Sequence, residues 1–165
     1  SQQGTFPLPA AQLDRFLFKL AIDYPSQDEE KTILKQFGRT PGKVNIEKIV
    51  SLDQIEMWSE QVKEITVHED IMTYIIQIVH STRNHPYIEL GLSSRASLAI
   101  LQAAKAYAFV NNRTFVTPDD VKSVIEPVCL HRMKLSPQGM LIHNLAEILT
   151  TIVEEVEAPV EANVR

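Results

Sequence analysis

Residues 93–110 read SSRASLAILQAAKAYAFV, and this stretch indicates the fold class more clearly than any other part of the chain. Ser93 or Ser94 can cap a helix, which then continues to about Val110. The many alanines in it favour helix and leave room for a neighbouring helix to approach closely. We therefore expect a helix that packs tightly against other helices.

Start and stop signals place further helices on both sides of this stretch. Ser26 precedes a segment with three acidic residues in its first turn, which suit the positive end of a helix dipole, and Gly38 ends it. Thr117 and Pro118 are an equally clear start, a cap followed by proline at the first helical position. The predicted helices cover residues 10–15, 26–37, 52–63, 68–84, 93–110, 117–131 and 143–156, with short extended pieces at 65–67 and 134–135.

The first 24 residues have a different character from the rest. Residues 16–22, FLFKLAI, form a compact apolar run typical of a buried strand. A single strand needs partners, and no nearby segment predicts a sheet. We expect residues 1–24 to be an arm from a larger unit, residues 25–157 to be a helical bundle with its own core, and residues 158–165 to be a frayed tail.

Composition and charge narrow the class of protein. The 165 residues are 44% apolar and 22% charged, so a core can form. A formal net charge of -5 argues against a broad nucleic-acid or anionic-membrane face, although it leaves room for a small basic site. No apolar run approaches the roughly 20 residues that span a bilayer. Cys129 is the single cysteine, and its apolar surroundings in the sequence predict a buried structural thiol in a reducing compartment, with the cytoplasm as the expected location.

The sequence contains no self-sufficient catalytic motif. It has neither the GxxxxGK[ST] phosphate-binding loop nor GxGxxG, and its five histidines form no HExxH or Cys/His set. The acidic pairs lie at helix starts or on polar ends, where they complement helix dipoles. We therefore expect no metal site, and no active site made from these residues alone.

Two arginines have positions that suit anion binding. Arg15 ends a short helix directly before the predicted strand, and Arg95 lies in the first turn of the alanine-rich helix. A cation in a first turn is unfavourable for the helix dipole. Together with the free amides of that turn, however, the guanidinium would make a receptor for an anion such as phosphate. From the residues alone, a surface ion pair at either arginine remains the alternative.

Several linked motifs follow one another over about residues 3–135. They are GTFPLPAAQLDRF at 4–16, YPS at 24–26 with Glu29 and Glu30, TRNHP at 82–86, GLSSRA at 91–96, RTFVTPDDV at 113–121 and LHR at 130–132. In this order and spacing they resemble the MoxR family of AAA+ ATPases, in which the first motif is similar to the segment after sensor 1. Ala10 and Ser94 depart from the pattern, since glutamate and proline respectively are usual there.

The resemblance implies a role for each arginine and for the chain. Arg15 is similar to an arginine finger that reaches the ATP of a neighbouring subunit, and Arg95 is similar to sensor 2, near the γ-phosphate. The fold implied is a mainly α AAA+ helical lid bundle, preceded by an arm with one strand of the ATPase core sheet. The Walker motifs and the sensor 1 asparagine would lie upstream, so ATP and Mg²⁺ belong to a longer parent protein and the fragment alone would bind neither.

For that parent, the resemblance implies a hexameric ring that couples ATP hydrolysis to chaperone-like remodelling or maturation of an unidentified client protein. No nucleic-acid partner is expected. Two alternatives stay open at this point. The chain could be a freestanding helical interaction module, or the lid of another AAA+ branch such as the magnesium-chelatase type, because the TPDDV motif at 117–121 also occurs in those lids.

Overall fold

The structure is a computed structural model that describes residues 8–38 and 46–160. The chain divides into two compact units. One is Leu20–Trp58, and the other joins the residues up to Lys19 to those from Ser59 onward. Every side chain that is buried within the described residues belongs to the second unit, so the hydrophobic core lies there.

The smaller unit contains helix α2 (Gln27–Phe37) and the beginning of α3 (Leu52–Lys63). At the start of α2 the Glu29 amide donates to Ser26 Oγ (3.4 Å), and the Ser26 amide donates to the Glu29 carboxylate (2.7 Å). This reciprocal capping box satisfies two amides that the helix itself leaves free. Gly38 follows the last residue, so both predicted ends of this helix are confirmed. The turn expected at Pro41 and Gly42 lies outside the described residues.

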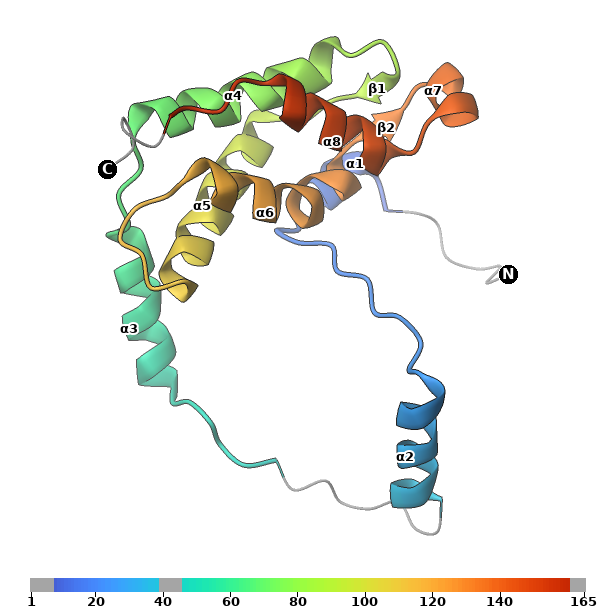
Figure 1. The fold of residues 1–165 in the computed structure, drawn as a ribbon, viewed down its shortest axis with the longest axis vertical. Helices are drawn as coiled ribbons and strands as arrows, with labels where there is room; N and C mark the ends of the chain where they lie inside the picture. The colour runs from blue at the N-terminus through green and yellow to red at the C-terminus, as the bar shows by residue number, and fades with distance from the viewer. Residues whose placement is uncertain (1–7, 39–45, 161–165) are drawn as a thin grey trace. The chain divides into compact units, whose positions relative to one another are not determined.

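The larger unit is a helical bundle with a small two-stranded sheet at one end (Figure 1). Helix α5 packs against α6 and α4, and α8 packs against α4 and α6. Strands β1 and β2 pair antiparallel, with Ile88 opposite Leu135 and Leu90 opposite Lys134. Besides α1 (Ala10–Leu13) and the end of α3, the elements are α4 (Glu69–Asn84), β1 (Ile88–Leu90), α5 (Ser94–Val110), α6 (Pro118–Cys129), the 3-10 turn η1 (Leu130–Arg132), β2 (Lys134–Leu135), α7 (Pro137–Ile142) and α8 (Leu145–Glu155).

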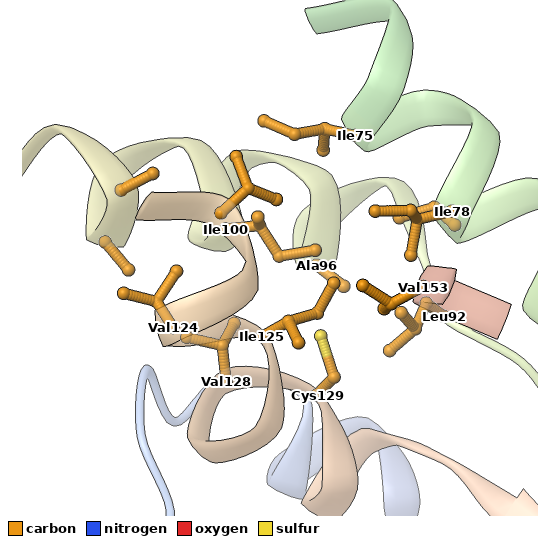
Figure 2. Close-up of a cluster of buried hydrophobic side chains, with 14 of the residues drawn as sticks. Ile75, Ile78, Leu92, Ala96, Ile100, Val124, Ile125, Val128, Cys129 and Val153 are labelled. Carbon is orange, nitrogen blue, oxygen red and sulfur yellow. The ribbon is translucent and has the colours of Figure 1, made fainter. Parts of the chain in front are cut away.

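The alanine face of α5 forms the middle of the core, as the sequence predicted. Its buried alanines are small enough to let α6 lie close, and larger apolar side chains from the other helices fill the remaining space (Figure 2). The side chains labelled there are Ile75, Ile78, Leu92, Ala96, Ile100, Val124, Ile125, Val128, Cys129 and Val153. The structure therefore confirms the mainly helical fold class.

Cys129 is fully buried in this cluster. Burial raises the pKa of its thiol to about 12, although the nearby positive charge of Arg132 acts in the opposite direction. At neutral pH the thiol stays protonated, and protonated thiols are poor nucleophiles. The structural role expected for Cys129 fits this environment. Within the described residues no helix is long and apolar enough to cross a membrane.

The strand expected at residues 16–22 is not formed. These residues are exposed and extend without forming a strand, and among the described residues no neighbouring strand pairs with them. A strand is stable only through pairing, so an apolar run without a partner has no reason to adopt one. The short helix expected at 10–15 is likewise reduced to the four residues of α1 and a following turn.

The carboxy-terminal helices also differ from the expectation. The helix predicted to reach residue 131 ends at Cys129 and tightens into η1, and the last helix begins at Leu145 instead of His143. Helix α7 was not predicted, although Ser136 caps it and Pro137 occupies its first position. Gly139 lies inside α7, where an added Cβ would stand 2.5 Å from the Tyr87 carbonyl oxygen. This glycine therefore serves close packing and does not end a helix.

An ion pair with a buried carboxylate fixes the corner between α5 and α6. Asp120 is 1% exposed, and both of its oxygens accept hydrogen bonds from the Arg113 guanidinium. The backbone amide of Thr117 also donates to this carboxylate, at 2.8 Å. Burial opposes ionisation of Asp120, but the hydrogen bonds from Arg113 and Thr117 and the Arg113 charge outweigh it and lower the pKa.

We expect Asp120→Asn to destabilise the chain at pH 7 by about 2 kcal/mol, because the Arg113 guanidinium loses its charged partner. A lowered folded-state pKa means that the carboxylate stabilises the fold above its unfolded pKa of about 3.9 and loses this effect as the pH falls through the folded value. Urea unfolding between pH 7 and pH 2 should therefore show the gap between wild type and variant closing in acid. Asp119→Asn, at an 86% exposed side chain, is the matched control. A gap that is constant with pH would contradict the assignment.

Candidate functional site

Arg95 lies in the first turn of α5, where the Ser93 side chain caps the helix. Ser93 Oγ accepts the Ala96 amide at 3.3 Å, which settles the choice between the two predicted caps. The Arg95 side chain is 59% exposed. Because the first-turn amides and the guanidinium carry the same sign, this end of α5 attracts anions.

The last turn of α4 sets the position of this helix start. The Leu92 amide donates to Thr82 Oγ1 (3.0 Å), and Arg83 Nε donates to the Leu92 carbonyl (2.7 Å). Gly91 lies so close to this turn that an added Cβ would be 2.8 Å from the Arg83 Cα. Only glycine fits there without movement of the backbone. The TRNHP and GLSSRA motifs thus meet, and together they aim the beginning of α5.

Arg132 anchors the leading segment of the chain to the bundle. Its side chain is 2% exposed, and its Nε donates to the Val128 carbonyl at 2.8 Å. Its two terminal nitrogens donate to the backbone carbonyls of Asp14 and Phe16, each at 2.6 Å. His131 Nε2 lies 2.9 Å from the same Phe16 carbonyl, which can only accept, so this nitrogen carries the proton.

The Asp14 carboxylate joins the anchor to the start of α5. Arg132 Nη1 donates to its Oδ1 at 3.0 Å, and the Ser93 hydroxyl lies 3.0 Å from each carboxylate oxygen. Arg95 Nη1 is 3.6 Å from Oδ2. Arg15 is the next residue after Asp14, so the turn that carries Arg15 lies beside the start of α5.

The two arginines differ in how they are held. Arg15 is exposed, and no ion pair involves it within residues 8–38 and 46–160. Arg95 does have the ion pair named as its alternative role, but a long contact at an exposed side chain is worth only about 0–1 kcal/mol. Such a pair leaves the Arg95 guanidinium available to an anion. With Arg132, two guanidinium groups contact the Asp14 carboxylate, and the exposed Arg15 is its neighbour in the chain, which makes this a local basic site on an acidic chain.

Sequence reasoning missed Asp14, Arg132 and the second role of Ser93. Asp14 and Arg132 are 118 positions apart, so no local pattern predicts their contact. A signal was nevertheless present, because Arg132 follows an apolar stretch that holds Val128 and Cys129. Arginine is almost never fully buried unless it is paired, so a carboxylate elsewhere was to be expected.

Comparison with known proteins gives the class of this domain. A protein-family model described as the AAA lid domain matches residues 80–152. That span runs from the last turn of α4 into α8 and includes Ser93, Arg95 and Arg132. The chain therefore carries an AAA+ lid domain.

Individual relatives narrow the family. YeaC, an uncharacterized protein of Bacillus subtilis, is 38% identical over 96% of this chain and 50% of its own length. The chaperone MoxR1 of Mycobacterium tuberculosis is 34% identical over 98% of this chain and 45% of its own length. A crystal structure described as a candidate ATPase from Cytophaga hutchinsonii matches with a TM-score of 0.86 at 30% identity, over 97% of this chain and 52% of that one. The chain belongs to the MoxR family of AAA+ proteins, and it spans about half the length of these relatives.

We expect Arg132→Met to release the turn that carries Arg15 while the bundle stays folded. Methionine fills a similar volume but donates nothing to the carbonyls of Asp14 and Phe16, and hydrogen bonds from a charged donor are worth about 1.5–3 kcal/mol each. Hydrogen–deuterium exchange of residues 14–19 should therefore accelerate about tenfold or more, with little change in α5 or α8. Arg132→Lys, which keeps the charge without the guanidinium fork, should lie between the two. Unchanged exchange in the folded methionine variant would show that the anchor contributes little.

Proposed function

We propose that the chain is the lid-bearing part of a ring-forming ATPase subunit whose Arg15 and Arg95 act together on one nucleotide. The observation that carries this proposal is the Asp14 contact with Arg95, made from the turn that presents Arg15. Two guanidinium groups carried by segments that contact each other suit a ligand with several negative oxygens. The similar crystal structure described as a candidate ATPase makes a nucleoside triphosphate the chemical class of choice.

The role that we propose for these arginines is to stabilise negative charge. In phosphoryl transfer, charge spreads over the oxygens of the transferred group, and an arginine that meets it raises the rate by roughly 10³–10⁵. Arg15 and Arg95 need only to be held in place and shielded from competing anions. Mg²⁺, when bound with ATP, would neutralise further phosphate charge. The sequence holds no phosphate-binding loop, so the rest of the nucleotide site would come from other segments of the parent protein.

The bonds of Arg132 to the leading segment bear on whether Arg95 acts on the nucleotide of its own subunit or of a neighbour. Asp14 and Phe16 are bonded to Arg132, so the Arg15 turn and the start of α5 belong to one body. If Arg15 contacts the ATP of a neighbouring subunit, as the arginine-finger role requires, Arg95 faces the same ATP because it belongs to the same body. We therefore assign both arginines to the neighbour's nucleotide, within a hexameric ring.

The exposed arm is a second support for a larger parent. Residues 16–22 include Leu20 and Ile22, which are 75% and 97% exposed. An apolar run that buries none of its side chains within the described residues is well suited to join a sheet as its last strand. The domain division expected from the sequence, with an ATPase-core arm ahead of a lid, remains part of this proposal.

The activity that we propose for the longer parent protein is taken from the relatives of this chain. One relative is named a chaperone, and we propose that ATP turnover here drives a chaperone-like remodelling or maturation of a client protein. The cytoplasm is the proposed location. Neither a nucleic-acid partner nor a second catalytic centre is part of the proposal.

The 165-residue chain by itself should neither bind nor hydrolyse ATP to a measurable extent, because two exposed arginines cannot replace a phosphate-binding loop. Isothermal titration with Mg·ATP and a phosphate-release assay test this directly. Inorganic sulfate at the same ionic strength controls for loose attraction of anions to the basic cluster. Tight, saturable ATP binding would contradict the division of the site between segments.

In the full-length protein, Arg15→Ala should abolish hydrolysis while nucleotide affinity stays close to wild type, since the finger meets charge only in the transition state. Arg95→Ala should lower turnover and weaken nucleotide binding to a smaller degree. Arg83→Ala would not be a neutral control, because the Arg83 side chain holds Leu92 in place. The control is Arg113→Lys, which keeps a positive charge at the α5–α6 corner and should preserve most of the activity. Steady-state turnover and nucleotide titration separate these results. Full hydrolysis by the Arg15 variant would refute the finger assignment.

A further inference from the structure

Asp14 is the point where three segments of the larger unit meet. Its Oδ1 accepts Arg132 Nη1 and its Oδ2 faces Arg95 Nη1, while the Ser93 hydroxyl lies 3.0 Å from both oxygens. The carboxylate is 19% exposed, between the buried Arg132 side chain and the largely exposed Arg95 side chain. It therefore connects a fixed guanidinium to one that faces solvent.

We propose that Asp14 is a positioning residue for Arg95, and that it sets this arginine relative to the turn that presents Arg15. The inference rests on the proposed function, because Arg95 has a task only if a nucleotide meets it. Asp14 itself touches no reacting atom in this assignment. It acts by limiting where the Arg95 guanidinium can lie before a phosphate arrives.

Arginine alone would be poorly ordered at this position. A free arginine side chain carries about 2 kcal/mol of rotamer entropy, which its binding partner must overcome. A weak ion pair to a rigid carboxylate reduces that loss without holding the guanidinium so firmly that phosphate cannot displace it. The two contacts of the Asp14 carboxylate fit this description, because it lies 3.6 Å from Arg95 but only 3.0 Å from Arg132.

The carboxylate itself rests on a rigid base. Arg132 is held by the Val128 carbonyl on one side and by the backbone of Asp14 on the other. Ser93 is fixed as the cap of α5. Because both supports belong to the bundle, the Asp14 oxygens have little freedom to follow a moving Arg95.

An asparagine substitution at this position separates positioning from anchoring. Arg132 is buried and can only donate, so in the Asp14→Asn variant the single amide oxygen would have to turn toward it. The amide NH2 would then face Arg95, with donor against donor. Asp14→Asn should therefore release Arg95, while the backbone bonds from Arg132 continue to hold the turn.

The test is a double-mutant cycle in the full-length protein, read as ATP turnover and nucleotide KM. We expect Asp14→Asn to lower kcat about tenfold with less than a twofold change in KM, and to cause no further loss in an Arg95→Ala background. Asp119→Asn, which removes an exposed carboxylate from a 3.8 Å ion pair, should stay within about twofold of wild type in both backgrounds. An equal loss from Asp14→Asn with and without Arg95 would overturn the inference, as would no loss in the wild-type background.

Failure of the proposed function gives a different result. If Arg95→Ala alone leaves turnover unchanged, Arg95 serves no nucleotide, and the proposed function fails together with the task given to Asp14. If Arg95→Ala impairs turnover but the cycle is additive, only the positioning role is lost. Should Asp14→Asn fail to fold, Asp14→Glu keeps the charge beside Arg132 and moves both oxygens by one methylene. The same cycle then applies, with the same dependence on Arg95 expected.

Discussion

The guanidinium of Arg132 is held between the end of α6 and the first turns of the chain, and the arrangement of the candidate site depends on that contact. Moving a charged group out of water is unfavourable unless all of its donors find acceptors. Here backbone carbonyls of Val128, Asp14 and Phe16 supply them, together with the Asp14 carboxylate. A segment that buries no side chain of its own is thereby fixed to the bundle. Without this contact the turn with Arg15 would lose its buried anchor and keep the side-chain contacts of Asp14 with Ser93 and Arg95, the Lys19 to Pro127 backbone bond and the His131 contact.

Helix α4, which is packed into the core, also holds the candidate site in position. The apolar face of that helix fixes its last turn, and Thr82 and Arg83 in that turn bond the residue just before the Ser93 cap. Gly91 permits the close approach because it has no side chain. The direction in which Arg95 leaves α5 is therefore decided by residues that never meet a ligand. These contacts also explain why the motifs at 82–86 and 91–96 occur together.

Local chemistry predicted most of the helices but little of their assembly. Caps such as Ser26, Ser93 and Thr117 act within three residues, so the sequence alone locates the helix starts. Helix α7 was missed because it is short and contains Gly139, whose close packing against Tyr87 only the fold reveals. The strand expected at residues 16–22 was not formed because strand formation requires a partner that periodicity cannot reveal. Arg15 and Arg95 were singled out from their places relative to the predicted helices. The contact between Asp14, which precedes Arg15, and Arg95 joins residues far apart in the chain, so only the fold reveals it.

The alanine face of α5 has an effect beyond allowing close packing. A buried long side chain gives up rotamer freedom worth up to about 2 kcal/mol, whereas a buried alanine gives up none. Ala96, Ala99 and Ala103, which follow Arg95 along the buried side, therefore become ordered without that penalty. The helix that displays the basic end is thus ordered at low entropic cost. This saving follows from the composition of the helix and requires no bound ligand.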